Sequence, residues 1–107
     1  MRRGSVVETV NAIHSKTTSP QQVLSESHQR FRETHEWLNA LAQPHYQDAE
    51  EACVKVDRES PLAGVPASVK ECFAVEGLQT TLGISSKCGQ IDVEDAAIVQ
   101  RLKACGV

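Results

Sequence analysis

The stretch that decides the fold covers residues 61–86 and reads PLAGVPASVKECFAVEGLQTTLGISS. Within it, the apolar residues Val65, Ala67 and Val69 occupy alternate positions. This alternation is typical of a strand that packs against a core on one face only. We therefore predict a strand that ends at Lys70. A lysine at the carboxyl end of a strand, close to turns, is a candidate catalytic residue.

Two further blocks accompany the segment of Lys70. Residues 77–83 read GLQTTLG, in which two glycines bracket a threonine pair and allow sharp turns of the backbone. Residues 95–106 contain DAAIV, then RL and a glycine. The order and spacing of these blocks, together with GVP and VK at residues 64–70, resemble the opening of an amidase signature enzyme. The resemblance covers most of the chain.

This resemblance implies an α/β fold, in which an N-terminal helical layer precedes the first strands of a mixed sheet. Residues 1–107 would then be the N-terminal portion of a single amidase domain, and we expect a truncated or partial chain. Lys70 would match the lysine of a Ser-Ser-Lys catalytic triad. Both serines of that triad belong to a glycine- and serine-rich segment, to which nothing in this sequence corresponds. We therefore expect the 107 residues alone to hydrolyse nothing.

The resemblance also implies a reaction, the hydrolysis of a carboxamide C–N bond. In the family's mechanism, Lys70 would take a proton from a bridging serine in a cis peptide, and that serine would take one from the nucleophilic serine. An acyl-enzyme forms and water releases the acid. A lysine serves as a base only when neutral, and its ordinary pKa of ~10.4 requires lowering by burial. Without the resemblance, a lysine that ends a strand is more typical of a solvated surface.

The residues after Lys70 bear on the substrate. Many family members continue with Asp-Asn, whereas this chain continues with Glu71, Cys72 and Phe73. This run is more similar to the fatty-acid amide hydrolase branch and favours hydrophobic acyl amides as small-molecule substrates. General amidases and the A subunit of glutamyl-tRNA amidotransferase stay open. The alternative from another class is a non-catalytic interaction module or remnant, whose apolar stripes would bind a partner.

Composition limits the partners of the chain. Eleven Lys and Arg residues stand against 14 Asp and Glu, which gives a formal net charge of −3. This balance argues against a general nucleic-acid surface or an anionic membrane surface. No apolar run approaches the ~20 residues of a membrane span, and no signal peptide is recognisable. We expect a cytoplasmic protein, and its oligomeric state stays open.

Four cysteines, Cys53, Cys72, Cys88 and Cys105, are widely spaced. The absence of a Cys-x-x-Cys pair argues against a metal site, and we expect neither a metal nor another cofactor. Without a secretory signal, reduced thiols are favoured over a disulfide framework. Cys72 has one alternative role, because a lysine nearby lowers the pKa of a thiol and makes it a nucleophile. No partner base for it is recognisable.

Four helices are expected, beginning near Ser5 and Ser19, covering about Ala49 to Val56, and running from about Val93 to Ala104. Ser5 and Glu8 form a capping box for the first helix. Ser19 stands at the N-cap of the second, with Pro20 at the first helical position and Gln22 at the third. These local signals predict a helical first half.

Several polar clusters have a structural rather than a catalytic interpretation. His28 and His35 lie seven residues apart on or beside an apolar helix face, and we expect them to pack rather than bind a metal. The acidic pair at 50–51 is expected to be solvated, since nothing apolar surrounds it. The serines at 85–86 lack a glycine-rich setting and are expected in a loop. Residues 39–43 are a candidate edge strand.

Overall fold

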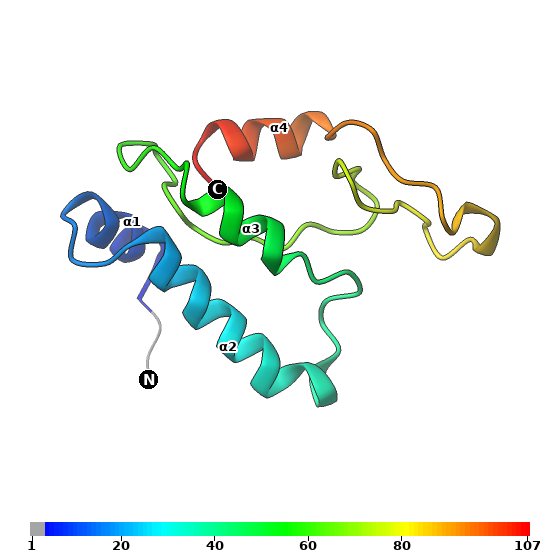
Figure 1. The fold of residues 1–107 in the computed structure, drawn as a ribbon, viewed down its shortest axis with the longest axis horizontal. Coiled ribbons are helices and arrows are strands. Elements are labelled where there is room, and N and C mark those ends of the chain that lie inside the picture. The colour runs from blue at the N-terminus through cyan, green and yellow to red at the C-terminus, as the bar shows by residue number, and fades with distance from the viewer. Residues whose placement is uncertain (1–3) are drawn as a thin grey trace. The chain divides into compact units, whose positions relative to one another are not determined.

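The structure is a computed structural model and describes residues 4–107. Its helices are α1 (Val6–His14), α2 (Pro20–Leu38), α3 (Tyr46–Cys53), the short 3-10 helix η1 (Ser85–Lys87) and α4 (Ala97–Ala104), as Figure 1 shows. None of these helices is long and apolar enough to cross a membrane. The chain forms two units: the first contains the chain up to Ala67 together with residues 105–107, and the second contains residues 68–104.

Both predicted helix starts in the first unit are confirmed. The Ser5 hydroxyl accepts the Glu8 N–H at 3.2 Å while the Glu8 carboxylate accepts the Ser5 N–H, so the capping box is complete. At the start of α2, the Ser19 hydroxyl accepts the Gln22 N–H at 3.1 Å. These bonds satisfy backbone donors that have no partner inside the helix.

Two chain segments far apart in sequence build the first unit together. Its buried apolar residues are Val10, Ile13, Leu24 and Ala63. Beside them, the Gly64 N–H donates to the Gly106 carbonyl at 2.8 Å. Gly106 has φ +93°, and a Cβ there would lie 2.6 Å from the Cβ of Ser60. The last three residues of the sequence therefore complete the packing that α1 and α2 begin.

Helices α2 and α3 contact each other through a cluster of rings. The His28 ring stacks on the Tyr46 ring, with 4.2 Å between centroids and 8° between planes. Phe31 lies 4.5 Å from the His35 ring. The packing role expected for both histidines is confirmed.

The strand predicted to end at Lys70 was wrong. The part of the chain that the structure describes contains no strand, and its β-pairing is a single isolated antiparallel bridge between Gln79 and Ile91. Residues 39–43 form no edge strand either. The physical reason is that apolar alternation fixes a strand only when a neighbour accepts its hydrogen bonds, whereas the Val65 N–H donates within a local turn at 3.1 Å. The sheet of the expected α/β fold is therefore not seen in the described residues.

The last helix starts later than the predicted Val93. Helix α4 begins at Ala97, because the preceding residue is bonded elsewhere: the Ala96 N–H donates to the Ala74 carbonyl at 2.9 Å. Long-range backbone bonds of this kind compete with helix propagation. Within α4, Val99 is the buried residue.

Candidate active site

Lys70, the candidate base, lies in the second unit in an irregular segment and is exposed. Its carbonyl accepts the Phe73 N–H at 3.0 Å, which closes a turn directly after it. Within residues 4–107, no ion pair joins its amine to a carboxylate. The backbone at Lys70 is thus held by a local turn, while its amine forms no ion pair with the described residues.

Glu71, the next residue, holds a second turn ten residues further along. One carboxylate oxygen accepts the Thr81 N–H at 2.5 Å and the Thr81 hydroxyl at 2.8 Å. The other oxygen accepts the Leu82 N–H at 3.0 Å. We call this carboxylate and its three donors the Glu71 clamp. The clamp ties the segment of Lys70 to the threonine-containing turn within one unit.

The donors of the clamp stabilise the charged carboxylate. The Thr81 hydroxyl and then the Thr81 N–H lower the pKa of Glu71 below its ordinary value, and the Leu82 N–H and the positive charge of Lys70 add to this effect. Desolvation raises the pKa, with a smaller effect than either Thr81 bond. Hydrogen bonds to the charged form of an acid favour that form. Glu71 is therefore an anion over the whole neutral range.

The turn inside the clamp has an uncommon backbone. Leu82 has φ +52° and Gly83 has φ +73°, so two consecutive residues adopt the left-handed region. Glycine does this freely, whereas a residue with a branched side chain pays about 1–2 kcal/mol. The Gly83 N–H donates to the Thr81 hydroxyl at 3.2 Å. The clamp and this bond together hold a conformation that leucine would otherwise avoid.

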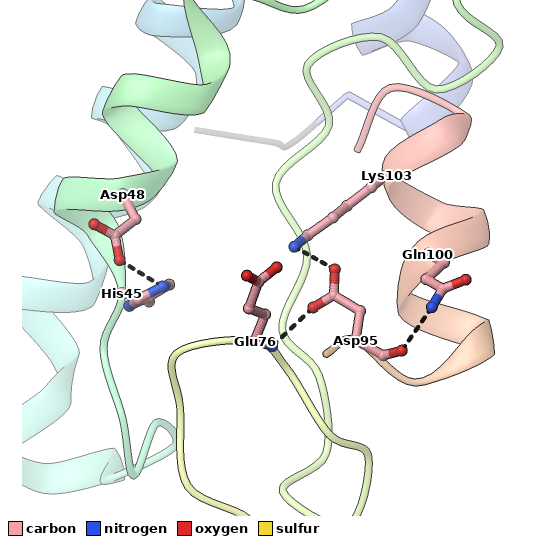
Figure 2. Close-up of polar contacts among 6 residues, drawn as sticks. All are labelled: His45, Asp48, Glu76, Asp95, Gln100 and Lys103. Atoms are coloured by element: carbon pink, nitrogen blue, oxygen red, sulfur yellow. Dashed lines mark hydrogen bonds and ion pairs between the residues drawn. The ribbon is translucent and has the colours of Figure 1, made fainter. Parts of the chain in front are cut away.

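Asp95 connects the start of α4 to the loop after Lys70. One of its carboxylate oxygens lies 2.6 Å from the Lys103 amine, and the other accepts the Glu76 N–H at 2.9 Å (Figure 2). The Gln100 side-chain amide donates to the Asp95 carbonyl at 2.9 Å. Lys103 is the main cause that lowers the pKa of Asp95. Asp95 thus connects the loop that contains Glu76 to α4 within the second unit.

The loop between Gly77 and α4 folds back on itself. The Thr80 hydroxyl donates to the Asp92 carboxylate at 2.6 Å, and the Gly77 N–H donates to the Asp92 carbonyl at 2.9 Å. The isolated bridge between Gln79 and Ile91 lies between these bonds. The two threonines therefore bind different carboxylates: the Thr80 hydroxyl donates to Asp92 in this loop, and the Thr81 hydroxyl donates to Glu71 in the clamp.

Comparison with known proteins identifies the family. The family model described as Amidase matches residues 22–107. This chain belongs to the amidase family. The match includes Lys70, the Glu71 clamp and α4, so the elements described above lie within the amidase region.

Individual relatives of this amidase-family chain have several named activities. An acylamidase of Rhodococcus erythropolis is 28% identical over 109 residues, which cover 95% of this chain and 23% of the relative. Fatty-acid amide hydrolase 1 of Sus scrofa is 32% identical over 99 residues, which cover 92% and 17%. The glutamyl-tRNA(Gln) amidotransferase A subunit of Bordetella petrii is 41% identical over 59 residues, which cover 55% and 12%.

A solved structure has the same fold over almost the whole chain. It comes from work on a vestigial protein complex that reveals the evolutionary origins of an s-triazine catabolic enzyme. Its TM-score is 0.89 at 31% sequence identity, with 96% of this chain and 24% of the other covered. The amidase-family chain therefore spans about a quarter or less of the length of these proteins.

The remaining candidates in this amidase-family chain do not join a site. The serines at 85–86 are exposed in η1. All four cysteines are free thiols, as expected, and Cys72 is exposed. Burial, followed by the charge of Glu50, raises the pKa of the Cys53 thiol. In the described residues, no group of three or more His, Cys, Asp or Glu could hold a metal ion.

Sequence reasoning treated Glu71 only as a departure from the family pattern and missed the clamp. A signal was present: an acidic residue followed ten residues later by a threonine and a glycine-bounded turn. Such a turn presents consecutive N–H groups that a carboxylate can accept. The structure brings these groups together, whereas in the described residues no hydrogen bond joins a serine to the Lys70 amine.

Proposed function

We propose that this chain is the N-terminal portion of a single amidase domain that, when complete, hydrolyses a carboxamide C–N bond. Lys70 would be the base of its Ser-Ser-Lys triad. The observation that carries the proposal is the family match over residues 22–107, which includes Lys70 and the three sequence blocks around it. The relatives named amidase, acylamidase and fatty-acid amide hydrolase support the same reaction class.

The chain would supply one of the four groups that the reaction needs. Amide hydrolysis requires a nucleophile, a base, donors for the tetrahedral oxyanion and an acid for the leaving amine. Lys70 is the candidate for the base, and it is exposed in this chain. Because burial favours the neutral form of a lysine, we expect the rest of the domain to cover Lys70 and to supply both serines. The 107 residues alone are then inactive.

For the substrate, we propose a hydrophobic acyl amide. The run of Glu71, Cys72 and Phe73 after the lysine supports it, as does the 32% identity to a fatty-acid amide hydrolase over 92% of the chain. A second candidate function is that of an amidotransferase A subunit, which the 41% identity over 59 residues to such a protein favours. The two differ in whether the acyl group or a glutamyl-tRNA is recognised.

The first test is the intact mass of the native protein, with peptide sequencing read through Val107. The proposal expects a mass several times the 11.7 kDa of this chain and a glycine-serine segment downstream. A native mass near 11.7 kDa would contradict the proposal of an amidase and favour an interaction module or remnant.

The second test is kinetic, on the complete protein with a long-chain acyl anilide. Lys70→Ala should lower kcat by about 10²- to 10⁴-fold, because the general base is lost. Lys70→Arg keeps the positive charge but cannot release a proton at neutral pH, so it should fail equally. The matched control is Lys55→Ala at an exposed lysine of the first unit. Turnover by Lys70→Arg would refute the role of base, and glutamine-dependent amidation of glutamyl-tRNA would favour the second candidate.

A further inference from the structure

We propose that Glu71 is a positioning residue for Lys70: the Glu71 clamp fixes the backbone from which the Lys70 side chain extends. The inference rests on the proposed function, because it assigns a role beside the proposed base. This role does not require Glu71 to contact the substrate.

The first step is geometric. The Lys70 carbonyl is held by the Phe73 N–H at 3.0 Å, and the side chain of the next residue is held by three donors on Thr81 and Leu82 at 2.5–3.0 Å. The peptide unit between Lys70 and Glu71 is therefore anchored on both sides. Within residues 4–107, which contain no strand, these bonds fix the backbone from which the Lys70 side chain extends.

The second step concerns charge. An anion next to a lysine favours the protonated amine, which cannot act as a base. Glu71 is the next residue after Lys70 and is an anion, so its charge opposes the neutral amine that the proposed chemistry needs. In the clamp, both carboxylate oxygens accept hydrogen bonds from the distant turn. Charge-assisted bonds of this kind hold the carboxylate at the turn, where the charge of Lys70 makes only the last-ranked contribution to its lowered pKa.

The third step separates positioning from simple stability. The clamp joins two loop segments outside the buried core: Glu71 and Thr81 are half-buried, and Leu82 is 52% exposed. Hydrogen bonds between loop segments outside the core order those segments locally more than they stabilise the cooperative core. The clamp is therefore suited to holding a local conformation rather than the fold as a whole.

The experiment uses the complete enzyme with three variants. Glu71→Gln keeps the size of the side chain but turns one acceptor into a donor that faces an N–H. Thr81→Val removes the hydroxyl and leaves the carboxylate in place. Glu94→Gln is the matched control, because Glu94 is exposed in the same unit. The readouts are kcat, KM, the pH profile of kcat/KM, and amide hydrogen exchange of the peptide that contains Thr81 and Leu82.

For Glu71→Gln we expect kcat to fall about 10- to 100-fold with KM within about twofold, since displaced catalytic groups lose rate at this scale. Amide exchange at Thr81 and Leu82 should accelerate. For Thr81→Val we expect a smaller loss of kcat and an acid limb of the pH profile displaced to higher pH, because a carboxylate released from a donor favours the protonated lysine. A purely structural role would move neither kcat at constant KM nor the pH profile.

The outcomes distinguish this inference from the proposed function. If Lys70→Ala abolishes turnover but Glu71→Gln and Thr81→Val both keep kcat and the pH profile of Glu94→Gln, the positioning role is overturned and the proposed function stands. If Lys70→Ala retains turnover, or the complete protein hydrolyses no amide, the proposed function fails and the positioning role fails with it. If Glu71→Gln does not fold, Thr81→Val alone decides through its pH profile.

Discussion

Two carboxylates, Glu71 and Asp95, hold the irregular part of the chain in shape. Each accepts a backbone N–H from a residue at least ten positions away, and each has a pKa below its ordinary value because of its donors. A group with a lowered pKa in the folded state contributes stability above its ordinary pKa. That contribution is lost as the pH falls through the lowered value. The loops of the second unit should therefore loosen in acid.

Titration of Glu71 checks the origin of its lowered pKa. We expect the carboxyl carbon signal of Glu71 to titrate below the ordinary ~4.3 of glutamate in an NMR experiment. Thr81→Val should move the midpoint upward, since the Thr81 hydroxyl is the main cause of the lowering. Thr80→Val is the control, because that hydroxyl donates to Asp92 instead. An unchanged midpoint in Thr81→Val would contradict the clamp.

Asp95 allows a test of stability. Its side chain is 10% exposed and pairs with Lys103, whose side chain is 55% exposed. Asp95→Asn should lower the free energy of unfolding by about 1–2 kcal/mol, because charge-assisted hydrogen bonds are weakened. Urea denaturation measures the loss. In a double-mutant cycle with Lys103→Met, the stability losses of the two single variants should sum to more than the loss of the double variant. Strict additivity would show that the pair is uncoupled.

At the scale of elements, two glycines with left-handed backbones differ in their surroundings. Gly64 has φ +68°, and a Cβ there would lie 2.7 Å from the Cβ of Pro20 at the start of α2. Gly77 has φ +84°, and a Cβ there would have no neighbour within 4 Å among the described residues. The pair therefore separates backbone strain from steric clash.

We expect Gly77→Ala to lower the free energy of unfolding by about 1–2 kcal/mol through backbone strain alone. Gly64→Ala should cost about 1–3 kcal/mol more, because overpacking against Pro20 adds to the same strain. Thermal and urea unfolding of both variants measure the difference. Equal losses would mean that the start of α2 yields to the added methyl group.

The elements that sequence reasoning predicted correctly are those with local causes. The caps at Ser5 and Ser19 join groups three residues apart, so the pattern itself contains both partners. The strand before Lys70 failed because its pattern specifies a face but no neighbour. The start of α4 failed because Ala96 is bonded to Ala74, a contact that no local pattern encodes.

The candidate site was predictable to the same extent. Lys70 could be named from the family resemblance that three sequence blocks carry, and its role stays a prediction. The Glu71 clamp could not be named, because its acceptor and donors are ten and eleven residues apart and the turn between them depends on a left-handed Leu82. Backbone conformations of this kind are disfavoured for leucine and are not expected from sequence.

At the scale of the whole molecule, the 107 residues expose much apolar surface. The large apolar side chains that are more than half exposed are Val6, Val7, Trp37, Leu38, Val54, Leu82, Ile91 and Val93. Exposed apolar side chains of this kind, in either unit, are often covered by a partner or favour association. This exposure fits a chain that spans a quarter or less of the length of its relatives.

Trp37 reports on the exposed apolar side chains of the first unit, because it is the single tryptophan of the chain and is 74% exposed. In the 107-residue chain produced alone at low concentration, we expect red-shifted emission and efficient quenching by acrylamide. Quenching should fall as the protein concentration rises if copies of the chain associate through a surface that includes Trp37. A blue-shifted, protected Trp37 at the lowest concentration would show that the chain covers this side chain itself.

The bond between Gly64 and Gly106 has a consequence for biosynthesis. Residues 105–107 complete a unit whose other part was translated before residue 68. At about 5–20 residues per second, a ribosome needs roughly 2–7 seconds to bridge that interval. Over that time Ala63, which is fully buried in the folded unit, lacks its contact with Gly106, so the nascent chain presents an incomplete core to chaperones until residues 105–107 emerge.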